Sequence, residues 1–246
     1  MPIVSNYSLP SDYKINPVLS HEKSANPFWN GVEDEFSLSW QEPVYQLAAS
    51  TANKLGCKRI VDVGCGTGFK TRKYFGGNGF QVIGVDQASG IEIAKQTQSN
   101  IEWWTTEIED YSLWGKLKAI SPEIILCCDV IEHLDNPSTL LKGIHEAMTE
   151  NTLFILSTPN RDALYPLSHK GPPYNPRHVR EWKYAELKKY VEGEGFLVVE
   201  HHDLLPRKYF FTSIEALRVI KRILLLKHLP DAKSCMCLFL KIRDTN

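Results

Sequence analysis

The alternation of short apolar segments with helical segments constrains this chain more than any other feature. Five runs of apolar residues, rich in β-branched and aromatic side chains, are predicted as strands at residues 59–63, 81–85, 101–104, 123–128 and 153–157. Helices are predicted between them at about 67–75, 90–98 and 137–148. Strands that alternate with helices form a parallel sheet covered by helices on both faces. The chain is therefore predicted to have an α/β fold.

The pattern changes after about residue 195, where two further strands are predicted at 196–200 and 235–242. We expect these strands to close the sheet as a hairpin-like edge. Three segments fall outside the alternation, at residues 1–41, 159–182 and 203–233, and they are too long to be plain connectors. The second is proline-rich and leaves the carboxyl end of a strand, where open α/β sheets bind ligands, so we expect it to cover a substrate.

The segment IVDVGCGTG places Gly64, Gly66 and Gly68 between a predicted strand and a predicted helix. Glycine there permits a sharp turn and a close approach of the backbone to a ligand. Asp86 ends the next strand, in the register that lets a carboxylate accept hydrogen bonds from two ribose hydroxyls. The alternative is a purely structural turn with a capping aspartate. The register of Asp86 favours a nucleoside cofactor.

The charge beside the glycines indicates which nucleoside is bound. A nicotinamide cofactor brings a pyrophosphate and the spacing GxGxxG, whereas this chain has GxGxG preceded by Asp62. The carboxylate of Asp62 would repel a pyrophosphate but attract an ammonium or sulfonium group. S-adenosylmethionine carries both cations and no phosphate, so the sequence favours it.

These motifs, VDVGCGTG, GVDQAS and an acidic segment after the third strand, resemble those of class I S-adenosylmethionine-dependent methyltransferases over roughly residues 42–202. The resemblance implies a Rossmann-like, mostly parallel seven-stranded sheet with an antiparallel last strand. It divides the single domain 1–246 into an N-terminal cover (1–41), a cofactor-binding core (42–202), an insertion (203–233) and the last strand (234–246). The cofactor-binding residues that it implies are Asp62, Gly64, Gly66 and Gly68 at the methionine end, Asp86 at the ribose, Thr106 or Glu107 at the adenine, and Cys128 or Asp129 facing the cofactor.

The stretch VIEHLDNP resembles ubiquinone-pathway O-methyltransferases and small-RNA 2'-O-methyltransferases. A hydroxyl acceptor must lose a proton, and a histidine suits that task, so His133 is the candidate general base. The alternative is a histidine satisfied by Asp135 or by the backbone. The resemblance also implies a set of Asp129, Glu132 and His133 that can bind a divalent metal. The first carboxylate side chain of this set, Asp129, is one carbon shorter than the glutamate of those relatives. We therefore assign no metal ligand.

A second histidine, His178, precedes a predicted helix in NPRHVREWKYAEL, which also resembles this family's acceptor-side motifs. His178 could be a second acid or base, a fourth metal ligand or a locally bonded loop histidine. The candidate catalytic residues are therefore His133, assisted by Glu132 or His178.

The chain has 28 basic and 29 acidic residues, so it lacks the excess of positive charge that binds nucleic acid. We therefore expect a small-molecule acceptor. The segment 205–230 is nonetheless basic and amphipathic, and it could be a packed lid, a peripheral membrane contact or a homodimer interface. Without a signal peptide or a long apolar run, a cytoplasmic location is expected.

The sequence therefore predicts an enzyme that methylates a hydroxyl of a small molecule, such as a sugar or a glycan intermediate. Two alternatives remain open. One is a 2'-O-methyltransferase of RNA, and the other is a module that binds S-adenosylmethionine without turnover.

Overall fold

The computed structural model describes residues 7–17, 31–77, 79–97, 99–107, 110–165, 169–205 and 233–243. Most of the predicted basic segment 205–230 lies outside the described residues. Among the helices that are described, none combines the length and the apolar character needed to cross a membrane.

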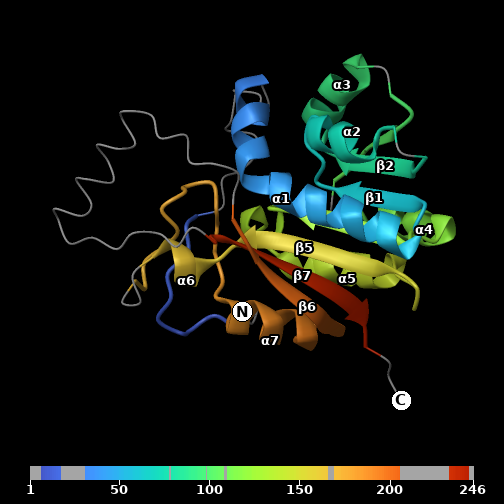
Figure 1. Ribbon diagram of the computed structural model, residues 1–246. Helices are drawn as coiled ribbons and strands as arrows, with labels where there is room; N and C mark the ends of the chain where they lie inside the picture. Colours follow the sequence, from blue (N-terminus) through green and yellow to red (C-terminus); the bar gives the residue numbers. More distant parts are fainter. Residues whose placement is uncertain are drawn as a thin grey trace.

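A seven-stranded sheet forms the centre of the molecule, with the strand order β3-β2-β1-β4-β5-β7-β6 (Figure 1). The strands are β1 (Arg59–Val63), β2 (Gln81–Asp86), β3 (Glu102–Thr105), β4 (Ile124–Cys128), β5 (Leu153–Pro159), β6 (Phe196–Leu204) and β7 (Cys235–Ile242). The first five strands are parallel, and β7 is antiparallel to both of its neighbours, β5 and β6. The predicted fold class, a mostly parallel sheet with an antiparallel last strand, is confirmed.

Helices cover both faces of the sheet, as the alternation predicted (Figure 1). They are α1 (Gly31–Leu55), α2 (Phe69–Phe75), α3 (Ala88–Gln96), α4 (Tyr111–Ile120), α5 (Pro137–Ala147), α6 (Arg161–Leu164) and α7 (Tyr184–Gly193), with a short 3-10 turn, η2 (Ile131–His133). Apolar side chains of α1 and α2 form one hydrophobic core with the sheet. Those of α4, α5 and α7 form a second core on the other face.

Helix α1 continues across the boundary at 41/42 that the resemblance implied. Figure 1 shows α1 as two arms with a bend between them. Pro43 lies inside the helix and lacks a backbone N–H, which accounts for a bend. The second arm buries Val44, Tyr45 and Ala48 against the sheet. Part of the predicted N-terminal cover is thus continuous with the core.

The central strands are apolar because both of their faces are buried. All five residues of β4 are at most 2% exposed, and four of the five residues of β1 are buried. A parallel strand between two helical layers has no solvent-facing side, so it reads as an unbroken apolar run. That property made these strands recognisable in the sequence.

Two distant segments meet beyond the carboxyl edge of the sheet, and together they are called the cover here: residues 7–17 and 169–183. The side-chain amide of Asn16 donates hydrogen bonds to the carbonyl oxygens of Pro173 (3.0 Å), Asn175 (3.1 Å) and His178 (2.9 Å). The backbone N–H of Asn16 donates to Val179 at 2.9 Å. The predicted covers from the N-terminus and from 159–182 therefore lie together, at the end of the sheet where a substrate was expected.

Candidate active site

The glycine loop between β1 and α2 is a tight turn in the left-handed region. The φ angles of Gly64, Gly66 and Gly68 are +78°, +59° and +68°. Side chains other than glycine rarely adopt such angles. A Cβ at Gly64 would also lie only 2.3 Å from Cγ2 of Val130, and one at Gly68 only 2.2 Å from the indole of Trp103. Both conformation and space therefore require glycine here, and the predicted turn is confirmed.

Asp86 lies against this loop, as its register predicted. Its Oδ2 accepts a hydrogen bond from the N–H of Gly66 at 2.7 Å, and its Oδ1 accepts one from the N–H of Gln87 at 2.7 Å. Burial raises the pKa of Asp86, and these two backbone donors oppose that shift. The carboxylate is thus oriented by the backbone at the end of β2.

Thr106 and Glu107 lie at the same edge, directly after β3. The backbone N–H of Thr106 donates to the carbonyl of Asp86 at 3.0 Å, and the side-chain amide of Gln87 donates to Glu107 at 2.9 Å. The glycine loop, Asp86 and residues 105–107 are together called the cofactor edge. The residues that the resemblance assigned to the ribose and the adenine are neighbours there.

Asp62 is fully buried at the root of the glycine loop. Its Oδ2 accepts hydrogen bonds from the hydroxyls of Tyr45 (2.9 Å) and Thr71 (2.6 Å), whereas its Oδ1 is buried without a partner among the described residues. Burial raises the pKa of Asp62 to about 6, against the effect of those two donors. A buried carboxylate oxygen without a donor beside the loop fits the cationic methionine end of S-adenosylmethionine.

Cys128 and Asp129 end β4 differently. The side chain of Cys128 is buried in the core beneath α1, so of the two candidates it is Asp129 that leaves the sheet. Asp129 adopts a φ of +51°, which is uncommon for a residue other than glycine. The hydroxyl of Ser157 donates to its Oδ1 at 2.8 Å, and its backbone N–H donates to the carbonyl of Ser157. Strand β5 thus holds the strained turn that leads to η2.

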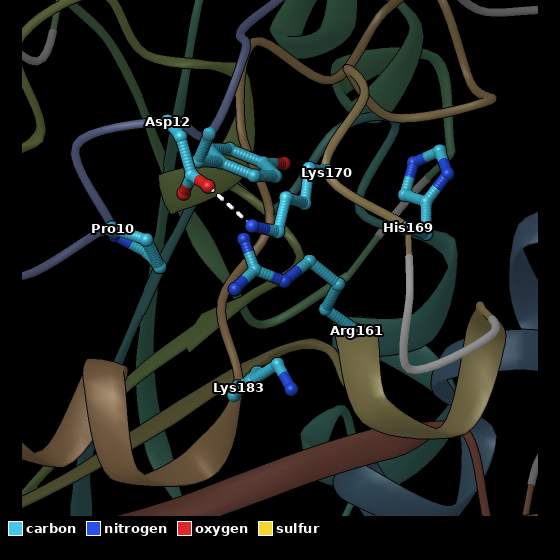
Figure 2. A pocket seen from close by; sticks show the side chains of 7 residues that line it. Pro10, Asp12, Arg161, His169, Lys170 and Lys183 are labelled. Atoms are coloured by element: carbon cyan, nitrogen blue, oxygen red, sulfur yellow. Dashed lines mark hydrogen bonds and ion pairs between the residues drawn. The ribbon is translucent and has the colours of Figure 1, made fainter.

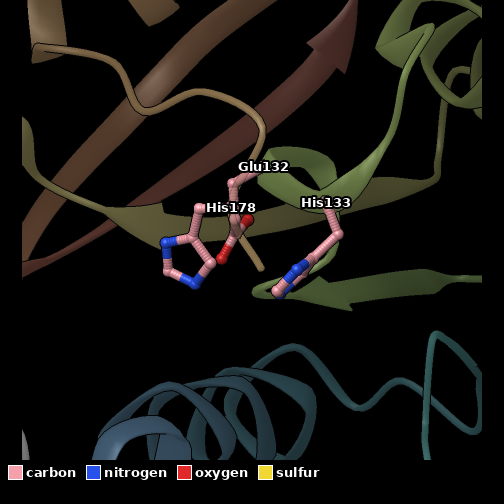
Figure 3. Close-up of side chains that lie close together, drawn as sticks. All are labelled: Glu132, His133 and His178. Carbon is pink, nitrogen blue, oxygen red and sulfur yellow. The ribbon is translucent and has the colours of Figure 1, made fainter. Parts of the chain in front are cut away.

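Three side chains converge just beyond this turn: Glu132, His133 and His178 (Figure 3). One potential ligand atom from each lies within 4.8 Å of the others, and the two imidazole rings meet edge to face at 4.8 Å. Val130, which packs on Gly64, precedes this cluster by only two residues. The structure therefore joins the three predicted catalytic residues and places them next to the glycine loop.

Glu132 is the buried member of this cluster. Its Oε2 accepts a hydrogen bond from the hydroxyl of Thr158 at 2.9 Å, and its Oε1 is buried without a partner among the described residues. Burial, together with the charge of Asp129, raises the pKa of Glu132 to about 8. Glu132 is therefore mostly protonated at neutral pH and does not act there as a strong base.

His133 is exposed, and its Nδ1 lies 2.9 Å from the carbonyl oxygen of Arg177. A carbonyl only accepts, so Nδ1 carries the proton and the lone pair of the neutral ring is on Nε2. This contact is the backbone hydrogen bond of the alternative interpretation. It also fixes the tautomer that a base requires.

His178 is held by a carboxylate and an amide. Its Nδ1 lies 2.5 Å from Oε1 of Glu181, and its Nε2 lies 2.8 Å from the side-chain amide nitrogen of Asn175. The oxygen of that amide accepts from the N–H of Arg177, so the amide donates to Nε2. Burial alone would lower the pKa of His178, but the hydrogen bond and charge of Glu181 and the charge of Asp129 raise it.

Glu181 was not predicted from the sequence. Its carboxyl group is 1% exposed, and it lies three residues after His178 in HVRE. An acid that close to a candidate histidine is the signal that could have revealed it.

The metal set implied by the resemblance needs correction as well. The described residues that can share an ion are Glu132, His133 and His178 rather than Asp129, Glu132 and His133, because Asp129 turns toward Ser157.

A metal ion would meet competition in this cluster. Both ring nitrogens of His178 are engaged, one by Glu181 and one by Asn175. An ion could use His178 only after one of these hydrogen bonds is broken. We therefore assign no metal ion to this cluster.

Residues 38–201 match the family model described as a methyltransferase domain. The chain belongs to the class I S-adenosylmethionine-dependent methyltransferases. This match spans the sheet core, the cofactor edge and the histidine cluster, so the resemblance read from the motifs is confirmed.

Curated relatives match part of the chain. The chain is 30% identical over 170 residues to a ubiquinone biosynthesis O-methyltransferase of Bradyrhizobium diazoefficiens, covering 63% of this chain and 65% of that protein. It is 29% identical over 150 residues to the enzyme of that name from Glaesserella parasuis, covering 58% of this chain and 63% of that protein. The chain thus spans less than two thirds of the length of these relatives.

Solved structures share the fold at lower identity. Magnesium protoporphyrin IX methyltransferase from Synechocystis with bound S-adenosylhomocysteine matches with a TM-score of 0.55 at 14% identity, over 88% of this chain and 89% of that one. A methyltransferase from Archaeoglobus fulgidus matches with a TM-score of 0.52 at 20% identity, over 80% of this chain and 94% of that one. These similarities establish the fold.

Proposed function

We propose that this chain transfers the methyl group of S-adenosylmethionine to a hydroxyl of a small molecule, such as a sugar or a related hydroxylated metabolite. The observation that carries the proposal is the pair His133 and His178, held in defined orientations beside the glycine loop. The names of the curated relatives support oxygen as the acceptor atom. The near-zero net charge supports a small molecule over nucleic acid.

S-adenosylmethionine supplies a methyl group that is already activated by its sulfonium. The chain then has two tasks, to align the acceptor oxygen with that carbon and to remove its proton. Asp86 and the glycine loop would hold the cofactor, and Nε2 of His133 would accept the proton. Burial raises the pKa of Glu132, so this group would limit the negative charge of the cluster at neutral pH.

The test compares His133→Ala and His178→Ala with the wild-type chain, using labelled S-adenosylmethionine and a panel of sugars and small hydroxylated metabolites. We expect the base variant to lose about 10²- to 10⁴-fold in turnover. Calorimetric titration with S-adenosylhomocysteine should give unchanged affinity for both variants. His202→Ala, on β6, is the matched control and should keep full activity. Unchanged methyl transfer in His133→Ala would overturn its role as the base.

Three further outcomes test the reaction class. Tight binding of NAD without binding of S-adenosylhomocysteine would overturn the proposal. Methylation of RNA whose affinity falls steeply with salt would replace the small-molecule acceptor with RNA. Cofactor binding without transfer to any acceptor of the panel, and with no effect of either histidine, would favour a non-catalytic binding module.

A further inference from the structure

A cavity of about 230 Å³ is lined by residues of the cover together with Arg161 (Figure 2). It is formed by segments far apart in the sequence, and its polar lining consists of Asp12, Tyr13, Arg161, His169, Lys170 and Lys183. We propose that this cavity binds an anionic group, a carboxylate or a phosphate, of the methyl acceptor. The assignment to an acceptor rests on the proposed function, whereas the preference for an anion rests on the cavity itself.

The lining carries an excess of positive charge. Arg161, Lys170 and Lys183 face the cavity, and Asp12 is the one carboxylate in its lining. Asp12 pairs with Lys170 at 2.5 Å. The acids that pair with Arg161 and Lys183 are Glu186 and Asp162, at 2.6 and 2.7 Å, and neither belongs to the lining. An anionic group would therefore meet two cations whose partner carboxylates lie outside the cavity.

Arg161 supplies a buried hydrogen-bond donor. Its side chain is only 3% exposed, and its Nε is buried without a hydrogen-bond partner among the described residues. The guanidinium stacks over the ring of Tyr13, with 4.2 Å between Cζ and the ring centroid, and Figure 2 shows it extending toward Lys170 and Asp12. A buried donor without an acceptor is costly, and the oxygen of a carboxylate or phosphate would satisfy it.

The cavity wall is joined to His178 through a single residue. The hydroxyl of Tyr13 accepts a hydrogen bond from the backbone N–H of Glu181 at 3.2 Å, and Arg161 donates to the carbonyl oxygen of Glu181 at 3.4 Å. The carboxyl group of Glu181 in turn contacts Nδ1 of His178 at 2.5 Å. An anionic group in the cavity would therefore be anchored close to the candidate catalytic histidines. Such an arrangement suits an acceptor with an anionic end and a hydroxyl to be methylated.

The experiment measures binding of inorganic phosphate by calorimetry and by thermal shift, at constant ionic strength with chloride as the reference anion. Lys170→Gln should weaken phosphate binding about tenfold, because it removes a cation and leaves Asp12 unpaired. Asp12→Asn should strengthen it, since it removes the one acid of the lining. Lys188→Gln, on α7 outside the cavity, is the matched control and should change nothing.

Arg161→Gln should weaken phosphate binding most, but Arg161 is buried, so the exposed pair Lys170 and Asp12 carries the test. Opposite shifts in Lys170→Gln and Asp12→Asn would support the proposal, because general destabilisation cannot produce both. No saturable effect of phosphate beyond that of chloride would overturn it, and so would equal affinity in all variants. Binding of a neutral polyol such as glucose in place of phosphate would overturn the anionic class.

Titration of the same variants with S-adenosylhomocysteine separates the two proposals. Affinity for the cofactor product should be unchanged in Lys170→Gln and Asp12→Asn. If the wild-type chain does not bind S-adenosylhomocysteine, the proposed function is wrong, but the phosphate result still stands. A normal methyl-transfer reaction without any phosphate effect would sink only the anion site.

Discussion

The cofactor edge and the cover are built in different ways. At the cofactor edge, Gly64, Gly66 and Gly68 form one short loop, and Asp86 reaches it through the register of two adjacent strands. In the cover, one side chain, Asn16, donates to carbonyl oxygens more than 150 positions away in the sequence. The first region is specified locally, and the second exists only once the chain has folded.

This difference bears on function. The backbone N–H groups and glycines of the cofactor edge suit a ligand that is the same throughout the family. The charged side chains of the cover, such as Asp12 and Lys170, can differ between family members without disturbing the sheet. We propose that the cover selects the acceptor.

Gly64→Ala should break the cofactor edge while sparing the cover. The positive φ and the contact with Val130 together should cost on the order of 4 kcal/mol of unfolding free energy, and S-adenosylhomocysteine binding should be lost. Urea unfolding and calorimetry measure both effects. Gly115→Ala, in open space on α4, is the control and should be neutral or slightly stabilising. Wild-type affinity in Gly64→Ala would contradict the steric argument.

Glu132→Gln, where the cofactor edge and the cover meet, should change the pH dependence of the free energy of unfolding. The pKa of Glu132 is raised from 4.5 to about 8, so the folded state holds this proton more tightly than the unfolded state. Wild-type stability is therefore lost as pH rises from about 4.5 to 8, and the amide escapes that loss. We expect Glu132→Gln to be more stable by about 3 kcal/mol at pH 7, with the difference shrinking toward pH 4.5.

Urea unfolding at pH 4.5, 6 and 8 measures this difference. Glu146→Gln, at an exposed position of α5, is the control and should show no such trend. A stability difference for Glu132→Gln that stays constant across this range would refute the burial argument.

Asn16→Ala should loosen the cover and spare the cofactor edge. The substitution leaves the carbonyls of Pro173, Asn175 and His178 without this donor and should cost about 2 kcal/mol locally. Hydrogen exchange in residues 169–183 should accelerate, while affinity for S-adenosylhomocysteine stays unchanged. Asn53→Ala removes a local hydrogen bond within α1 and serves as the control. Equal loss of cofactor affinity in Asn16→Ala would show that the two regions are not independent.

The raised pKa of His178 predicts the shape of the activity profile in acid. A base must be unprotonated. If His178 rather than His133 accepts the proton, kcat/KM should decrease on acidification with a midpoint above pH 6.5. Replacing Glu181 by Gln removes the partner that raises this pKa and should move the acidic limb to lower pH. The pH–rate profiles of the two chains measure the shift, and coincident profiles would exclude His178 as the titrating base.

The sequence determined the sheet and the cofactor edge. Strands such as β1 and β7 were predicted at their observed bounds because buried parallel and central strands are unbroken apolar runs. Helices α1 and α4, by contrast, were not predicted, and the predicted boundary at 41/42 divides α1. The glycine loop and Asp86 were predicted together because their partnership follows from strand register alone.

Tertiary structure decided the rest of the site. No spacing in the sequence indicates that Tyr13 meets Arg161, or that Asp129 turns toward Ser157. Burial, which raises the pKa of Glu132, is likewise a property of the packed molecule. Local geometry is encoded by neighbouring residues, whereas contacts between distant side chains and their desolvation arise only when the layers pack. The sequence thus determined the glycine loop and its contact with Asp86, and only the fold brought together the side chains of the proposed acceptor site.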